Sequence, residues 1–283
     1  MPLGAIGLLF ASAILHTTWN LLVKRTEEKY ITVWWGMLLG STLFLPFLFF
    51  TGLPPSSTWI LLLISVLFEI AYYIALTSAY NDSDFSLVYP IGRGAAPAFI
   101  ALWSVLFLSE RLTSGGIIGI IIIIIGLMIV GGTSLFQSHT KPPLRGLFLA
   151  ILLGLFISIY STIDGAVVKK TATFPYAILI FFLAPTFMTP HVLKLYGWTK
   201  LKVQFAAYRW RMLLVGLLTV TSYFLALVAY SASRVGYAGA IREVSVVMAA
   251  FAGWKFLGER LGGTRVIGAV VIFAGILVIA FFG

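Results

Sequence analysis

The chain has 283 residues, of which 60% are hydrophobic and only 10% are charged, with a mean hydropathy of +1.05. Soluble domains carry about 25% charged residues, so a soluble enzyme, a soluble nucleic-acid binder and a disordered protein are all excluded. The composition is typical of a polytopic membrane protein. Cysteine is absent, which rules out disulfides, thiolate metal sites and a cysteine nucleophile.

Apolar runs separated by polar, proline or glycine breaks predict ten transmembrane helices. The runs lack the in–out alternation of barrel strands, and open sheets cannot satisfy their backbone in lipid. The first run is interpreted as an uncleaved span rather than a signal peptide, because it lacks a basic n-region and is followed by Lys24-Arg25. The expected spans are 3–23, 31–51, 59–80, 86–108, 115–132, 145–166, 175–196, 211–231, 235–257 and 264–282.

The two halves of the chain repeat each other. A shift of 149 residues places Arg93 on Arg242 and the block Glu110-Arg111-Leu112 on Glu259-Arg260-Leu261. Five spans per half is an odd number, so the second half must enter the membrane in the opposite sense, as in many alternating-access transporters. The sequence therefore predicts an all-α membrane protein of two inverted five-helix repeats, at residues 1–137 and 138–283.

These features carry a family resemblance. The chain resembles bacterial members of the drug/metabolite transporter superfamily, in the branch built from two EamA domains. The resemblance rests on the repeated spans, the opening segment Leu15-His16-Thr17-Thr18-Trp19-Asn20 and the Glu-Arg-Leu block before the last span of each half. It implies ten helices around a central cavity, with the fifth and tenth as a scaffold. The solutes of such proteins range from amino acids to cations and drugs.

The span ends and the last span of each half have structural interpretations. Gly119 and Gly126 lie seven residues apart in the fifth span, and Gly268 and Gly275 repeat this spacing in the tenth. Small residues in such a stripe favour close helix packing. The Glu-Arg pairs at 110–111 and 259–260 are expected to be loop ion pairs or helix caps, and a gating role is the alternative.

The basic residues predict the orientation in the membrane. Of the 19 lysines and arginines, 13 lie in the odd-numbered connections between spans, four in the even-numbered connections, and two within spans. The positive-inside rule then places the odd-numbered connections in the cytoplasm and both termini outside a bacterial inner membrane. The net charge of +10 thus needs no nucleic-acid partner.

Two arginines within spans are the first candidates for substrate binding, because ionisable groups in a membrane are costly and often mark a pathway. Arg93 lies between Pro90 and Pro97, which predicts a kinked or loosened helix. Its guanidinium suits a carboxylate or phosphate. We expect Arg93 and its repeat Arg242 to contact the solute; the alternative is a buried ion pair with a nearby acid.

Three acids lie within the expected spans, at Glu69, Asp164 and Glu243. Each is a candidate for proton coupling, because burial disfavours the charged form of a carboxyl group, or for a structural ion pair with an arginine. Thr219 stands at the position of Glu69 in the second half, which favours a role that one half alone needs. Asp164 could bind an ammonium group or a proton, or form an interfacial pair with Lys169-Lys170.

A polar stripe on the first span is expected to face the cavity, since lipid would penalise it. His16 and Asn20 form this stripe, and they match Tyr160 and Asp164 in the second half. Ordinary packing is the alternative for His16. The expected substrate-binding residues are His16, Trp19, Asn20, Tyr73, Tyr89, Arg93, Tyr160, Tyr223 and Arg242.

These observations predict a secondary transporter of a small polar metabolite, anionic or zwitterionic such as an amino acid. It would act as a monomer by alternating access, coupled to a proton or a counter-solute. No cofactor, metal or enzymatic activity is expected, because neither a nucleotide-binding loop nor a cluster of nucleophile, base or metal ligands is present. The alternatives are a transporter of organic cations or drugs that uses the acids and aromatic rings, a lipid-acting membrane enzyme, and a channel.

Overall fold

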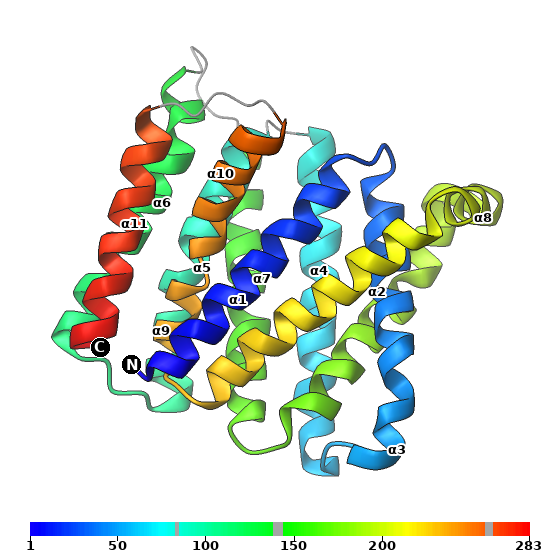
Figure 1. Ribbon diagram of the computed structural model, residues 1–283, viewed down its shortest axis with the longest axis horizontal. Coiled ribbons are helices and arrows are strands. Elements are labelled where there is room, and N and C mark those ends of the chain that lie inside the picture. Colours follow the sequence, from blue (N-terminus) through cyan, green and yellow to red (C-terminus); the bar gives the residue numbers. More distant parts are fainter. Residues whose placement is uncertain (83–84, 138–143, 258–262) are drawn as a thin grey trace.

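The computed structural model is helical throughout the residues that it describes (Figure 1). Its backbone is described for residues 1–82, 85–137, 144–257 and 263–283, and its side chains for the same ranges except 76–91, 131–147, 253 and 257. The helices are α1 (Leu3–Lys24), α2 (Lys29–Phe44), η1 (Leu45–Phe47), α3 (Leu48–Thr51), η2 (Ser56–Thr58), α4 (Trp59–Asp82), α5 (Phe85–Leu108), α6 (Ser114–Gln137), α7 (Leu144–Val168), α8 (Thr173–Ser231), α9 (Val235–Ile241), α10 (Val244–Leu257) and α11 (Gly263–Phe282).

The helices form a membrane-embedded bundle. Within the described ranges, seven helices are long and apolar enough to cross a membrane, and two shorter apolar stretches lie at Gly92–Leu108 and Ser114–Val130. Large apolar side chains such as Phe49, Ile60 and Val270 are exposed on the outside of the bundle. A soluble monomer avoids an apolar surface of this extent. The chain is therefore a multi-pass helical membrane protein.

The connection expected at 197–210 is helical rather than irregular. Helix α8 continues through it and departs from helical backbone angles at Gly197 (φ 71°) and Tyr208 (φ −129°). Between these bends Leu201 is buried, whereas Lys200 and Lys202 are exposed. This segment is amphipathic, so its mean hydropathy is too low to mark it as a span although its backbone remains helical.

The helix break expected at Arg93 is found instead at Arg242. Helix α5 runs without interruption from Phe85 to Leu108, past Arg93 and both flanking prolines. The expected span 235–257 is divided into α9 and α10, with Arg242 and Glu243 in the turn between them. From Glu243 onward the turn contains amides that bond three residues back, as in the 3.1 Å bond from Glu243 N–H to the Ala240 carbonyl.

Helices α6 and α11 pack antiparallel through their glycines, side by side at one edge of the bundle (Figure 1). A methyl group added to Gly119 would lie 2.9 Å from the Gly275 carbonyl oxygen, and one added to Gly275 would lie 2.8 Å from the Gly119 oxygen. Gly126 and Gly268 form the same reciprocal contact, at 2.9 and 2.8 Å. The packing predicted from the glycine spacing is confirmed, because any larger side chain would separate the two backbones.

The bundle has two ends, which we name by what they carry. The terminal face carries both chain ends (Figure 1), where the Met1 ammonium donates to the Ala280 carbonyl at 3.5 Å. It also carries the connections 109–113, 169–172 and 232–234. The far face carries the connection 25–28 and the bend of α8 at Gly197.

Candidate functional site

A cavity of about 400 Å³ penetrates the bundle from the far face. Glu27, Glu28 and Lys29, at the connection between α1 and α2, line its mouth, and Thr219 and Arg242 line its interior. Ligand pockets measure roughly 300–1,000 Å³, so the cavity suits a small metabolite.

The cavity brings together most of the residues predicted to bind substrate. Of the nine expected positions, eight line it: His16, Trp19, Asn20, Tyr73, Arg93, Tyr160, Tyr223 and Arg242. The ninth, Tyr89, lies outside the described side chains. Glu69 lines the cavity as well, whereas Asp164 and Glu243 are buried behind its wall.

The break between α9 and α10 places Arg242 in the cavity. Its guanidinium carbon lies 4.9 Å from the centre of the Tyr223 ring, on α8, in a cation–π contact. Among the described side chains Arg242 forms no ion pair. An arginine stays protonated at any physiological pH, so its charge faces the cavity and the tyrosine ring.

Arg93 is held by the residues that follow the same break. Its Nε lies 3.0 Å from Glu243 Oε2 in a buried ion pair, and its NH2 group donates to the Ser245 hydroxyl at 2.9 Å. Thr17, on α1, donates to the Ser245 carbonyl at 3.3 Å. Arg93 thus forms the buried ion pair expected as the alternative, which joins α5 to the start of α10. It also lines the cavity.

Glu69 is the acid that faces the cavity. It is 7% exposed on α4, and its Oε2 has no hydrogen-bond partner among the described residues. A buried carboxylate oxygen without a donor is costly. The side chain therefore suits a ligand ammonium group or a proton.

Asp164 is completely buried beneath the cavity wall, on α7. Its Oδ1 accepts hydrogen bonds from Ser65 (2.5 Å) and Tyr176 (2.8 Å), and its Oδ2 accepts one from Tyr223. The alternative partner Lys169 instead binds Glu110 at the terminal face. Asp164 thus joins α4, α7 and α8, and Tyr223 connects it to the cavity.

Aromatic rings form much of the cavity wall. The ring of Tyr160 lies edge-on to Tyr72 and to Tyr223, each at 6.3 Å between centres, and Phe181 lies 5.5 Å from Tyr223. On α1, His16 and Trp19 form a T-shaped pair at 5.0 Å. Such edge-to-face pairs favour a fixed arrangement of rings.

Small polar groups complete the wall, and most already bond to the backbone. Asn20 Nδ2 donates to the His16 carbonyl at 2.8 Å and Thr219 Oγ1 to the Val215 carbonyl at 2.7 Å. Ser222 donates to the Ser12 carbonyl at 2.9 Å. Their acceptor oxygens remain able to receive a hydrogen bond from a ligand.

Sequence reasoning missed several lining residues. Phe181 carried no signal, because aromatic residues in a span face lipid, protein or cavity alike, and Tyr72 was noted only as a helical neighbour of Glu69. Thr219 was noted only as the counterpart of Glu69 in the second half. The missed set is Val23, Glu27, Glu28, Lys29, Tyr30, Val33, Tyr72, Phe181, Tyr196, Thr219 and Ser222.

Comparisons with known proteins identify the fold and the family. A solved crystal structure of a protein shares 15% sequence identity with this chain at a TM-score of 0.75, and the match covers 98% of this chain and 96% of the other. A search of curated proteins finds no match. The profile of the EamA-like transporter family matches residues 3–132 and again residues 144–281. Because these two matches cover nearly the whole sequence, the chain belongs to the EamA-like transporter family, within the drug/metabolite transporter superfamily.

Proposed function

We propose that this protein is a secondary transporter of a small polar metabolite, anionic or zwitterionic such as an amino acid. The observation that carries the proposal is that Arg242 and Glu69, of opposite charge, line the same cavity. Arg242 would hold the carboxylate of the solute by a charge-assisted hydrogen bond. Glu69 would receive the ammonium group, and the tyrosine rings would surround the remainder.

Alternating access between two inverted five-helix halves, 1–137 and 138–283, would move the solute. The reciprocal glycine contacts of α6 and α11 support this arrangement, because Gly119 meets the repeat of Gly126 and Gly126 meets the repeat of Gly119, as a two-fold relation between the halves requires. The cavity is open toward the far face. With the odd-numbered connections in the cytoplasm and both termini outside, this is the inward-facing state of a transporter in a bacterial inner membrane.

Glu69 is also our candidate for the coupled proton. Of the three acids within the spans it alone lines the cavity among the described residues, whereas Glu243 pairs with Arg93 and Asp164 with three hydroxyl groups. A proton and a solute ammonium group would then compete for one carboxylate. Such competition couples the two movements without a further ion site.

A transporter of organic cations is the second candidate. The aromatic walls and Glu69 favour it, since rings and a carboxylate together bind quaternary ammonium groups. The guanidinium of Arg242 opposes it, because a second cation in the same cavity is repelled. The ligand set below separates the two candidates.

The test is ligand-induced stabilisation of the purified protein in detergent. Alanine, leucine and phenylalanine are screened first, and then leucine, N-acetyl-leucine and leucinamide are compared, because these three share a side chain but differ in charge. A ligand present at 100 times its Kd stabilises the folded state by about 2.7 kcal/mol. We expect leucine to stabilise the protein most and N-acetyl-leucine less. We expect no stabilisation by leucinamide or by choline, a quaternary ammonium ion that represents the organic cations.

Arg242→Met is compared with Arg234→Met as a matched control. Arg234 also lies over a tyrosine ring, with its guanidinium carbon 5.3 Å from the centre of Tyr237, but it is near the terminal face and away from the cavity. We expect Arg242→Met to abolish stabilisation by leucine and Arg234→Met to retain it. Stabilisation by choline or leucinamide that survives Arg242→Met would establish the cation alternative instead.

A further inference from the structure

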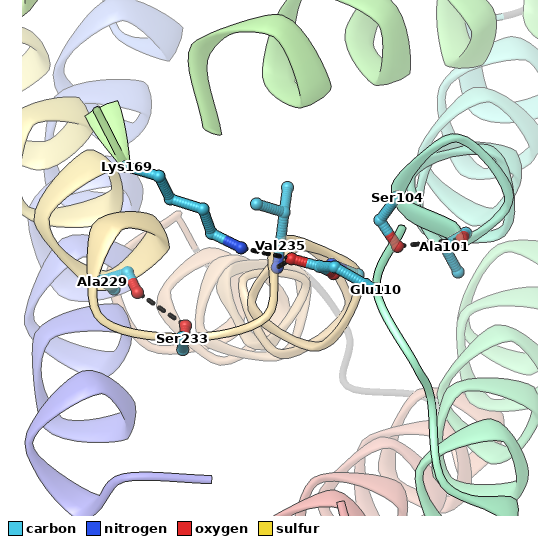
Figure 2. A network of polar contacts seen from close by, with 8 residues as sticks. Ala101, Ser104, Glu110, Lys169, Ala229, Ser233 and Val235 are labelled. Atoms are coloured by element: carbon cyan, nitrogen blue, oxygen red, sulfur yellow. Dashed lines mark hydrogen bonds and ion pairs between the residues drawn. The ribbon is translucent and has the colours of Figure 1, made fainter. Parts of the chain in front are cut away.

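The carboxylate of Glu110 binds three groups on the terminal face. Glu110 lies two residues after the end of α5 and is 9% exposed. Its Oε1 accepts from Lys169 Nζ at 2.5 Å and from the Val235 N–H at 2.7 Å, and its Oε2 accepts from the Gly236 N–H at 3.1 Å (Figure 2). Figure 2 shows the Glu110 side chain reaching from the segment after α5 toward Val235 and Lys169.

The backbone after α5 directs this side chain. Ser109 adopts φ 54°, a left-handed conformation that is uncommon outside glycine. The Glu110 N–H then donates to the Ser104 carbonyl at 3.1 Å, so the chain folds back under the end of α5. The Arg234 side chain makes no capping bond to α9. Glu110 thus supplies the acceptor for the first amides of α9 from a distant segment.

This contact joins the two halves of the chain. Glu110 lies in the first half, whereas Lys169 and the two amides belong to the second. Beside the contact, α5 and α9 pack closely: a methyl group added to Gly236 would lie 2.7 Å from Ser104 Oγ, and one added to Gly239 would lie 2.9 Å from Ile100. An opening toward the terminal face would separate α9 and α7 from α5, and that separation would break every bond to Glu110.

We propose that Glu110 is the residue that locks the terminal face closed. Its carboxylate holds the end of α7 and the start of α9 against the end of α5, and transport requires its release. The bonds are charge-assisted, and the carboxylate and the two amides are buried although the Lys169 side chain is 31% exposed, which makes the set stronger than a fully exposed ion pair. The need for release rests on the proposed alternating access, but the lock itself is measurable without any solute.

The chain contains no cysteine, so one introduced thiol reports on one position. Ser104→Cys places the reporter in the fully buried seam between α5 and α9, next to Glu110 and outside the cavity lining. Ser158→Cys is the matched reporter, because this serine is equally buried but lies in the middle of α7, farther from the terminal face than Ser104. The rate of modification by N-ethylmaleimide is measured for each thiol in purified protein.

Each reporter is combined with Glu110→Gln, Lys169→Ala or Lys170→Ala. We expect Glu110→Gln and Lys169→Ala to raise the labelling rate of the Ser104→Cys thiol about tenfold or more, which corresponds to the loss of one charge-assisted hydrogen bond. Lys170→Ala is the control, because Lys170 is an exposed neighbour of the same charge. It should leave the rate unchanged, and the Ser158→Cys thiol should stay protected in every variant.

Two results would overturn the lock. One is an unchanged rate at Ser104→Cys in the Glu110→Gln protein; the other is an equal rise at Ser158→Cys, which would indicate general loosening rather than opening of one face. Neither result bears on solute binding in the cavity, which the ligand-stabilisation experiment tests separately.

Discussion

Removing the hydroxyl of Tyr176 should destabilise the protein more when residue 164 is aspartate than when it is asparagine. Tyr176 donates to Asp164 Oδ1 at 2.8 Å, and both side chains are fully buried. Three hydroxyl groups bond to this carboxyl group, and all three can donate only if it is ionised. The prediction therefore tests whether an unpaired buried charge is stabilised by hydroxyl groups alone.

The magnitude follows from the type of hydrogen bond. A bond to a charged group contributes about 1.5–3 kcal/mol and a neutral bond about 0.5–1.5 kcal/mol. Tyr176→Phe should thus cost about 2 kcal/mol in the native chain and about 1 kcal/mol in the Asp164→Asn protein. The difference, a coupling energy of about 1 kcal/mol, lies within the range for residues in direct contact.

The assay is equilibrium unfolding of the four purified proteins of the double-mutant cycle, in mixed micelles with increasing sodium dodecyl sulfate, followed by tryptophan fluorescence. Tyr237→Phe is the control, because Tyr237 is a buried tyrosine whose hydroxyl accepts the Thr113 N–H at 2.7 Å, at the terminal face. Its effect should add to that of Asp164→Asn within about 0.5 kcal/mol. Zero coupling between Tyr176 and Asp164 would show that the carboxyl group is neutral and would refute this reasoning.

Two further predictions use the same unfolding assay. Gly40→Ala should lower the free energy of unfolding by about 1–3 kcal/mol through overpacking, since its new methyl group would lie 2.7 Å from the Gly216 carbonyl oxygen. Gly7→Ala is the control, because its methyl group would meet nothing within 4 Å, and it should raise the free energy of unfolding by about 0.5–1 kcal/mol. Equal effects of the two substitutions would contradict the close contact between α2 and α8. Glu28→Gln should lower the free energy of unfolding by less than about 1 kcal/mol, and this effect should disappear in high salt. The reason is that the 2.6 Å ion pair joins side chains that are 27% (Glu28) and 44% (Lys200) exposed. A large loss of stability that does not depend on salt would contradict this.

The cavity residues were predictable where a polar side chain is rare. Arg242, Asn20 and Glu69 stand in otherwise apolar helices, so each must face protein or a cavity rather than lipid. The glycine stripe of α6 and α11 was predictable for a related reason, since small residues repeated at one spacing have few uses in a span except close packing. In each case the other possible surroundings of the residue are unfavourable, so the residue type alone predicts what it contacts.

Other features depend on contacts that are distant in sequence. Proline suggested a break near Arg93, but in a transmembrane helix the surrounding helices can satisfy the freed backbone groups, and α5 stays continuous. The break at Arg242 has no such local signal, because the packing of α9 against α5 determines it. Asp164 matches Asn20 by repeat position, yet the hydroxyls of Ser65 and Tyr176 hold it behind the cavity wall. No spacing in one helix indicates which neighbour a side chain will meet.

The contacts between the two halves are of two physical kinds, and this difference bears on how such a protein could move. Along α6 and α11 the halves meet backbone to backbone at the glycines, with the side chains of Ile123, Ile272 and Ile279 packed around them. At Glu110 and at the Arg93–Glu243 pair they meet through a few charged groups as well as through the packing of α5 on α9, and the charged groups can exchange partners. Packed interfaces tend to keep their geometry, whereas ion pairs are replaceable when water or a ligand enters. We therefore expect α6 and α11 to stay together in both access states, while α5, α7 and α9 separate at the terminal face.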